Sequence, residues 1–184
     1  GNISISAWLN FESLGAGTLH TLMQKSNNTG NQRGFLLRYE VDGAVLSFIN
    51  SSDGIASTTG SVAWSPSTAT WYHVVARYTA SAGTVRFDVG NVQQGATQSG
   101  LATSIFDNTA TFLIGAGNEG TGNFFDGLID EPLLTSDLLT DAEVTSLFNG
   151  EDASLMGLDN VAGYWKLNNG LTDESANANT LTNN

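Results

Sequence analysis

The sequence of 184 residues contains no cysteine, so neither disulfide bonds nor thiolate metal sites can contribute to its fold. Lysine and arginine are also scarce: six of them stand against eighteen aspartates and glutamates, which gives a net charge of −12. This balance argues against nucleic acid as a partner, because phosphate binding needs a basic surface. No run of about 18 apolar residues is present, so we expect no insertion into a membrane.

Proline is nearly absent, whereas glycine, serine, threonine and asparagine are abundant. Two prolines and 21 glycines fit a chain of many short strands joined by tight turns. A length of 184 residues suits one domain with a core large enough to fold alone. Because the chain starts at Gly1 without a signal sequence, we expect it to be a processed or excised piece of a larger protein.

Apolar and polar residues alternate along most of the chain, which predicts on the order of ten to fourteen strands, enough for two packed sheets. The clearest hairpin joins 35–41 to 44–49 through Asp42-Gly43, a pair typical of the type I′ turn. A second hairpin joins 71–79 to 84–89. These patterns predict an all-β protein.

One short helix is predicted near residues 140–149. Thr140 and Glu143 have the spacing of a capping box, in which each side chain hydrogen-bonds to the backbone amide of the other residue. Asn149-Gly150 then supplies a stop signal. No other segment of the chain has comparable helix signals.

Three motifs follow one another in the chain: Ser4-Ile5-Ser6-Ala7-Trp8-Leu9, Trp71-Tyr72-His73-Val74-Val75-Ala76-Arg77-Tyr78, and Phe124 to Leu134 with the predicted helix behind it. Together they resemble the laminin-G-like, concanavalin A-like lectin/glucanase jelly-roll domains. The resemblance implies one domain over residues 1–184, built as a two-sheet antiparallel jelly-roll sandwich with a single short helix. It implies less about function, because this fold carries many functions.

The last part of the chain departs from the family's order. A strand at 161–167 and a polar loop at 173–181 come at the end, whereas in the resembling domains such segments come first. Either the chain is cut from a tandem array and its tail opens the next repeat, or 161–184 folds back as the family's first strand, an apparent circular permutation. We favour the second interpretation, because sandwich termini lie close together and an empty first-strand position would leave a sheet edge bare.

The resemblance also points to a structural Ca²⁺ ion, which related domains often carry near the closing strand. Asp130 on that strand would be a neighbour of Asp173 and Asn177 if the tail folds back, and Ca²⁺ prefers six to eight oxygen ligands. The predicted metal ligands are therefore Asp130, Asp173 and Asn177. In the alternative interpretation, Asp173 and Asn177 only cap turns through hydrogen bonds to the backbone.

Aromatic side chains are the first candidates for sugar binding, because a pyranose ring stacks its C–H face on Trp or Tyr. Trp71 and Trp165 match strands of the family's core, so we expect both to be buried. Trp64 stands beside Ser65-Pro66 and a polar stretch, so we expect it to be exposed. The predicted ligand-binding residues are Trp64 and, from the glycine-rich loop 115–123, Asn118, Glu119 and Asn123.

Catalysis is not predicted. A glycosidase needs two carboxylates about 5 to 9 Å apart across a sugar, whereas Asp130 and Glu131 are adjacent and would point to opposite faces of a strand. The laminarinase-like glucanases carry a Glu-x-Asp-x-x-Glu pattern, and no Glu precedes Asp130 at the spacing that this pattern requires. His20 and His73 lie within strand patterns and are interpreted as structural.

These observations favour a non-catalytic carbohydrate-binding or adhesion module of a larger extracellular or surface protein. Its partner would be a glycan or a surface polysaccharide. The alternative is a structural module of an assembly, such as a phage tail fibre, a capsid decoration or a spacer repeat, whose partners are other modules or copies. We expect an extracellular, cell-surface or virion location in either case.

Overall fold

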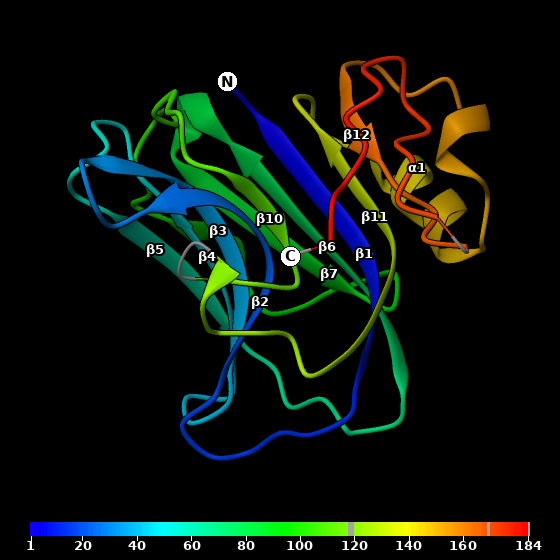
Figure 1. Ribbon diagram of the computed structural model, residues 1–184, viewed down its shortest axis with the longest axis horizontal. Helices are drawn as coiled ribbons and strands as arrows, with labels where there is room; N and C mark the ends of the chain where they lie inside the picture. The colour runs from blue at the N-terminus through cyan, green and yellow to red at the C-terminus, as the bar shows by residue number, and fades with distance from the viewer. Residues whose placement is uncertain (118–119, 169, 184) are drawn as a thin grey trace.

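The computed structural model describes residues 1–117, 120–168 and 170–183, which form two antiparallel sheets packed face to face (Figure 1). The seven-stranded sheet has the order β12–β11–β1–β6–β7–β8, with β9 also paired to β7. Its strands, in that order and ending with β9, are Val161–Tyr164, Gly127–Thr135, Ile3–Phe11, Trp71–Thr79, Thr84–Val89, Val92–Gln93 and Gln98–Ser99.

The five-stranded sheet has the order β10–β2–β3–β4–β5. Its strands, in that order, are Phe112–Ile114, Leu19–Asn27, Gln32–Glu40, Val45–Asn50 and Thr58–Ala63. The predicted all-β, two-sheet antiparallel sandwich is confirmed.

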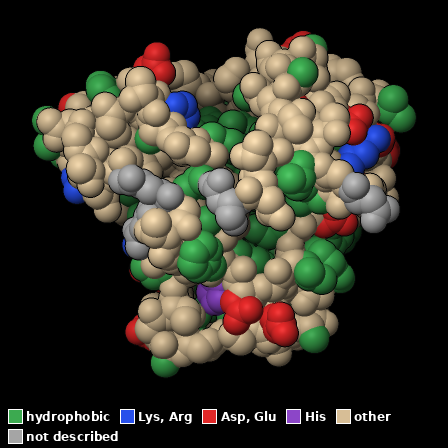
Figure 2. All heavy atoms as spheres, in the orientation of Figure 1, with side chains coloured by type: hydrophobic (Ala, Val, Ile, Leu, Met, Phe, Trp, Pro, Cys, Tyr) green, Lys and Arg blue, Asp and Glu red, His purple; other side chains and the backbone are tan. Residues whose placement is uncertain are grey.

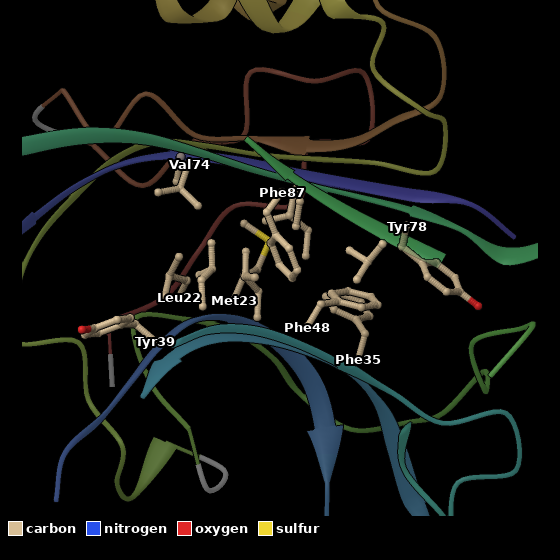
Figure 3. Packing of buried hydrophobic residues seen from close by; sticks show 14 of the residues in the cluster. Leu22, Met23, Phe35, Tyr39, Phe48, Val74, Tyr78 and Phe87 are labelled. Atoms are coloured by element: carbon tan, nitrogen blue, oxygen red, sulfur yellow. The ribbon is translucent and has the colours of Figure 1, made fainter. Parts of the chain in front are cut away.

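The main core lies between the two sheets (Figure 3). Met23 and Phe48 reach into it from the five-stranded sheet, and Val74, Tyr78 and Phe87 meet them from the seven-stranded sheet. The rings of Phe48 and Tyr78 stack with centroids 5.2 Å apart. Because side chains alternate along a strand, the residues between these core positions point to the outer face of each sheet.

The outer face of the seven-stranded sheet carries a second, smaller core. Helix α1 (Asp141–Phe148) and the segment after it pack there, on the side of this sheet that faces away from β2–β5 (Figure 1). The capping box is present as predicted, with the Glu143 amide donating to Thr140 Oγ1 over 3.2 Å and the Thr140 amide donating to Glu143 Oε2 over 2.6 Å. The described residues also include the short 3₁₀ helices Ala80–Ala82 and Ala153–Leu155.

Ion pairs fasten α1 to the sheet beneath it. Arg77 Nη2 lies 2.9 Å from Asp88 Oδ2 and 2.7 Å from Asp141 Oδ1, and its Nη1 donates to the Leu139 carbonyl over 2.9 Å. Arg86 also pairs with both carboxylates. Both arginines therefore hold the helix against the sheet.

Both predicted hairpins are present, but the turn between β3 and β4 differs from the predicted type I′. The last strand pair is Glu40 with Val45, which leaves four residues, 41–44, in the loop. A left-handed φ of 46° occurs at Ala44 and not at Asp42-Gly43. The Val41 amide donates to the Thr18 carbonyl over 3.2 Å, so strand pairing ends one residue earlier than a two-residue turn requires.

Strand β11 contains a β-bulge. Its pairing with β1 shifts between Asp130 and Leu133, so that Glu131 and Pro132 together oppose a single residue. Glu131 has a left-handed φ of 49°. The bulge explains how a proline fits inside a sheet, because a bulged residue need not donate to the ladder.

The tail packs against the sandwich. Strand β12 adds to β11 with Leu133 opposite Tyr164, and the Trp165 amide donates to the Pro132 carbonyl over 3.0 Å. The Trp165 ring stacks on Phe112 of β10 at 5.6 Å between centroids, so this residue contacts the edge strand of the other sheet. Trp165 is buried, as predicted. That this tail replaces the family's first strand stays a prediction.

Candidate ligand-binding cleft

A polar cleft of about 230 Å³ opens on the outer face of the five-stranded sheet, over β2 and β3. In the part of the chain that the structure describes, neither a helix nor a second hydrophobic cluster covers this face, unlike the outer face of the other sheet. The residues that line the cleft are Gln24, Ser26, Asn27, Asn28, Thr29, Leu36, Arg38 and Asn123. We call this hollow the outer cleft.

Strand alternation sets the floor of the outer cleft. Leu37 of β3 points into the core, so its neighbours Leu36 and Arg38 point outward. Arg38 lies opposite Thr21 of β2 and Ser47 of β4. Paired residues of antiparallel strands project from the same face, so a row of polar side chains crosses the outer face of the sheet at this level.

One wall of the outer cleft is the loop that follows β2. Asn27 Oδ1 accepts from the Thr29 amide over 2.6 Å, the arrangement of an Asx turn. Arg33 Nε donates to Asn28 Oδ1 over 3.0 Å. These two bonds fix the orientation of both asparagine side chains at the rim of the cleft.

The opposite wall is formed by the end of the glycine-rich loop. The Asn123 carbonyl accepts from the Thr21 amide over 3.1 Å, which holds the loop against β2. A Cβ atom on Gly117 would lie only 2.7 Å from Thr21 Oγ1, so the loop needs glycine to approach the strand this closely. Of the three predicted ligand-binding residues in this loop, Asn123 lines the cleft, and Asn118 and Glu119 lie outside the described residues.

Arg38 is the charged side chain of the outer cleft. Its Nη2 lies 3.0 Å and its Nε 3.1 Å from Glu40 Oε1, and both side chains are partly exposed. None of the described residues that line the cleft is an aspartate or glutamate.

The expectation that Trp64 is an exposed ligand-binding residue is wrong. Trp64 is only 7% exposed and packs edge-on against Phe11, Tyr39 and Tyr72 inside the core. Its amide donates to the Ala44 carbonyl over 2.9 Å, which continues the β4–β5 pairing by one residue and turns the ring inward.

Trp71, which we expected to be buried, is 43% exposed. It lies opposite Asn10 on the outer face of the seven-stranded sheet, where Leu128 is the other neighbour of Asn10. Leu128 is 61% exposed. The ring of Trp8 stacks on Phe148, so helix α1 shields Trp8 from solvent. The helix does not cover the neighbouring Trp71.

Asp173 caps the loop of the tail. Its Oδ1 accepts from the amides of Tyr164 and Ser175 over 2.9 and 2.8 Å, and its Oδ2 accepts from Ser175 Oγ and from the Asn179 amide over 2.9 and 2.7 Å. Burial acts to raise the pKa of the Asp173 carboxyl, but the hydrogen bonds from the three amides outweigh it and lower the pKa. This carboxylate holds the turn together.

The other two predicted metal ligands also make backbone hydrogen bonds. Asn177 Nδ2 donates to the Val161 carbonyl over 2.6 Å, and Asp130 Oδ1 accepts from the Glu131 amide over 3.0 Å. Asp173 and Asn177 are thus brought together on the loop, in the capping roles of the alternative interpretation. Within the described ranges, no three His, Cys, Asp or Glu side chains are grouped so that they could hold a metal ion. The Ca²⁺ ion stays a prediction.

The two histidines are buried, in agreement with a structural role. His73 Nε2 lies 2.8 Å from Ser6 Oγ, and its ring packs against Trp8 and Phe148 beneath α1. Glu131 and Asp130 do not line the outer cleft. Burial, with the nearby Asp130 and Asp152 carboxylates, raises the pKa of Glu131.

A larger hollow of about 800 Å³ runs between the edge strand β10, β11 and the tail. Figure 2 shows hydrophobic side chains on its floor. Phe112, Phe125 and Ile129 are among the residues that line it. Polar residues such as Lys25, Asn179 and Thr180 also line it, but apolar atoms make up most of its surface, whereas polar atoms make up most of the surface of the outer cleft.

A family model described as the concanavalin A-like lectin/glucanases superfamily matches residues 1–145. The chain belongs to this superfamily. The matched range contains β1 to β11 and the start of α1, so β12 and the tail of this lectin/glucanase domain lie outside it.

Solved structures share the fold at low sequence identity. A putative carbohydrate binding protein from Bacteroides ovatus is 19% identical with a TM-score of 0.65, and the match covers 95% of this chain and 49% of that one. The CBM40 of the Ruminococcus gnavus IT-sialidase, bound to α2,3-sialyllactose, is 17% identical with a TM-score of 0.63, covering 80% and 82%. A heptameric SAP-like pentraxin from Limulus polyphemus is 15% identical with a TM-score of 0.60, covering 80% and 69%.

The chain thus spans about half the length of the Bacteroides ovatus protein. No curated protein matches the sequence. In the described part of this lectin/glucanase domain, no helix is long and apolar enough to cross a membrane.

Proposed function

We propose that this domain is a non-catalytic carbohydrate-binding module that holds its glycan in the outer cleft. The observation that carries the proposal is the composition of the cleft, whose walls present amide and hydroxyl groups around the apolar side chain of Leu36. Amides and hydroxyls both donate and accept, as sugar hydroxyls require. The carbohydrate-binding proteins among the structural neighbours support this choice within a fold that carries many functions.

The proposed setting is a larger secreted or surface protein, in which this domain serves for adhesion or for targeting to a polysaccharide. The Bacteroides ovatus protein, twice as long as the matched region, is consistent with such an arrangement. A chain with a net charge of −12 and an exposed polar sheet face is also suited to a hydrated environment.

A glycan array with point variants tests the proposal. Leu36→Glu places a charged side chain on the floor of the cleft, and we expect affinity for the bound glycan to fall at least tenfold. Ile49→Glu is the matched control, because Ile49 lies opposite Leu36 on the same face but does not line the cleft. If no glycan on the array binds, or if both variants bind like the wild type, the proposal is wrong.

The predicted Ca²⁺ ion is tested separately by thermal unfolding. If Asp130, Asp173 and Asn177 hold the ion, addition of Ca²⁺ after treatment with a chelator raises the Tm, and the same concentration of Mg²⁺ raises it less. An unchanged Tm would contradict the predicted Ca²⁺ ion.

The second candidate function is a structural module of an assembly, such as a phage tail fibre, a capsid decoration or a surface array. The exposed side chains of Trp71 and Leu128, which flank Asn10 on one face, favour it, because apolar side chains grouped on a surface mark contact sites. Sedimentation at high protein concentration tests it, with Trp71→Ser as the variant that should abolish association. A strictly monomeric wild-type protein would argue against it.

A further inference from the structure

We infer that the outer cleft selects glycans that carry a carboxylate, and that Arg38 is the residue that recognises it. This inference rests on the proposed glycan-binding function and names its ligand class. The positions of the few Lys and Arg side chains in this acidic chain support it.

Four of the six basic side chains are engaged away from the cleft. Arg77 and Arg86 pair with Asp88 and Asp141 beneath α1. Lys166 pairs with Asp152, and Lys25 Nζ donates to the carbonyls of Asn108 and Ala110. The remaining two, Arg33 and Arg38, lie at the outer cleft, with Arg33 behind the rim and Arg38 in the lining.

Arg38 retains donors for a ligand. Glu40 contacts Nε and Nη2 through one carboxylate oxygen, and Glu40 does not itself line the cleft. Among the described residues, Nη1 of Arg38 has no hydrogen-bond partner. The Glu40 contact therefore orients the guanidinium and leaves both N–H groups of Nη1 for an acceptor.

The asparagines at the rim also present donors. The Oδ1 atoms of Asn27 and Asn28 are already occupied by the Thr29 amide and by Arg33 Nε. Each Oδ1 keeps one lone pair, so the two N–H groups of Nδ2 are the larger part of what each side chain can still offer a ligand. A rim of donors beside a guanidinium matches a ligand group that only accepts, as an ionised carboxylate does.

Among the described residues that line the cleft none is aromatic, so a bound sugar gains nothing from ring stacking on them. Its affinity must come mainly from polar contacts, and hydrogen bonds between charged groups are about twice as strong as neutral ones. The net charge of −12 meanwhile opposes general adsorption of anions, so an acidic glycan that binds must be held by local contacts.

The experiment compares acidic glycans, sialylated or uronic-acid-containing, with their desialylated or carboxyl-reduced counterparts on one array. The expected result is that the wild type binds the acidic member at least tenfold more tightly. Arg38→Gln removes the charge and should erase this preference, and Arg38→Lys, which keeps the charge without the planar fork, should restore only part of it. Lys166→Gln is the control, since it makes the same change of net charge away from the cleft.

Circular dichroism and tryptophan fluorescence confirm that each variant is folded. Equal or tighter binding of the neutral counterparts, or an acidic preference that survives in Arg38→Gln, overturns the inference and leaves the glycan-binding function standing. If the wild type binds no glycan, both are overturned. Loss of binding in Leu36→Glu with no change in Arg38→Gln assigns the cleft to neutral sugars.

Discussion

His73 is predicted to make the stability of this domain depend on pH. Its ring is 2% exposed, lies beneath α1 between Trp8 and Phe148, and has Ser6 Oγ at 2.8 Å from Nε2. Nδ1 has no partner among the described residues. Burial lowers the pKa of His73 to about 4, and the nearby Asp88 carboxylate offsets only part of this effect.

The direction of the pH effect on stability follows from the two pKa values of His73, about 4 in the folded state and 6.5 in the unfolded state. Between these values the unfolded chain binds the proton more readily, so acid favours unfolding. One unit of pKa difference corresponds to about 1.4 kcal/mol, so the free energy of unfolding should be about 2 kcal/mol lower at pH 5 than at pH 7.5. The loss should reach about 3 kcal/mol at pH 4.

The test is urea denaturation of the wild type and His73→Gln between pH 7.5 and 4.5, followed by tryptophan fluorescence. The variant should be about 1 kcal/mol less stable at pH 7.5, because its packing is poorer, and as stable as the wild type or more so at pH 5. His20→Gln is the control, because it retains the pH dependence that His73 causes. Parallel loss of stability in wild type and His73→Gln would refute the reasoning.

Three further changes test the packing. Asp173→Ala removes the acceptor of four hydrogen bonds, so we expect the free energy of unfolding to fall by roughly 3 kcal/mol and amide exchange to accelerate in the tail. Gly34→Ala would bring a Cβ within 2.3 Å of the Lys25 carbonyl and should block folding in circular dichroism, whereas Gly15→Ala, with its nearest atom at 3.6 Å, should fold normally. Trp64→Ala should cost about 3 to 5 kcal/mol in urea unfolding, and Trp71→Ala less than about 1 kcal/mol. Equal costs for the two tryptophans would contradict their observed burial.

Elements that depend on neighbouring residues were predictable from the sequence. The capping box needs only Thr140 and Glu143, three residues apart, and it forms as expected. Both hairpins follow from alternation on either side of a short turn. The type of the first turn was not predictable in this way, because it depends on Thr18, a residue of another loop.

Burial of individual aromatic residues was the weakest part of the sequence-based prediction. Trp64 and Trp71 both stand at strand ends beside polar residues, and the sequence does not distinguish them. Their exposure differs because Trp64 turns into the space between the sheets, whereas Trp71 projects from the outer face at a level that α1 does not cover. The face on which each ring lies and the position of the helix on the sheet together decide this difference in exposure.

By itself, the sequence determined that the protein is an all-β sandwich with one capped helix, because short-range periodicity and turn chemistry specify strands wherever they occur. Only the tertiary structure decided where a ligand could bind. Asn27 and Arg38 belong to the β2–β3 hairpin, and Asn123, from a distant part of the chain, meets them because the glycine-rich loop is held against β2. Such meetings depend on long-range pairing and close backbone approach, which leave no periodic pattern in the sequence.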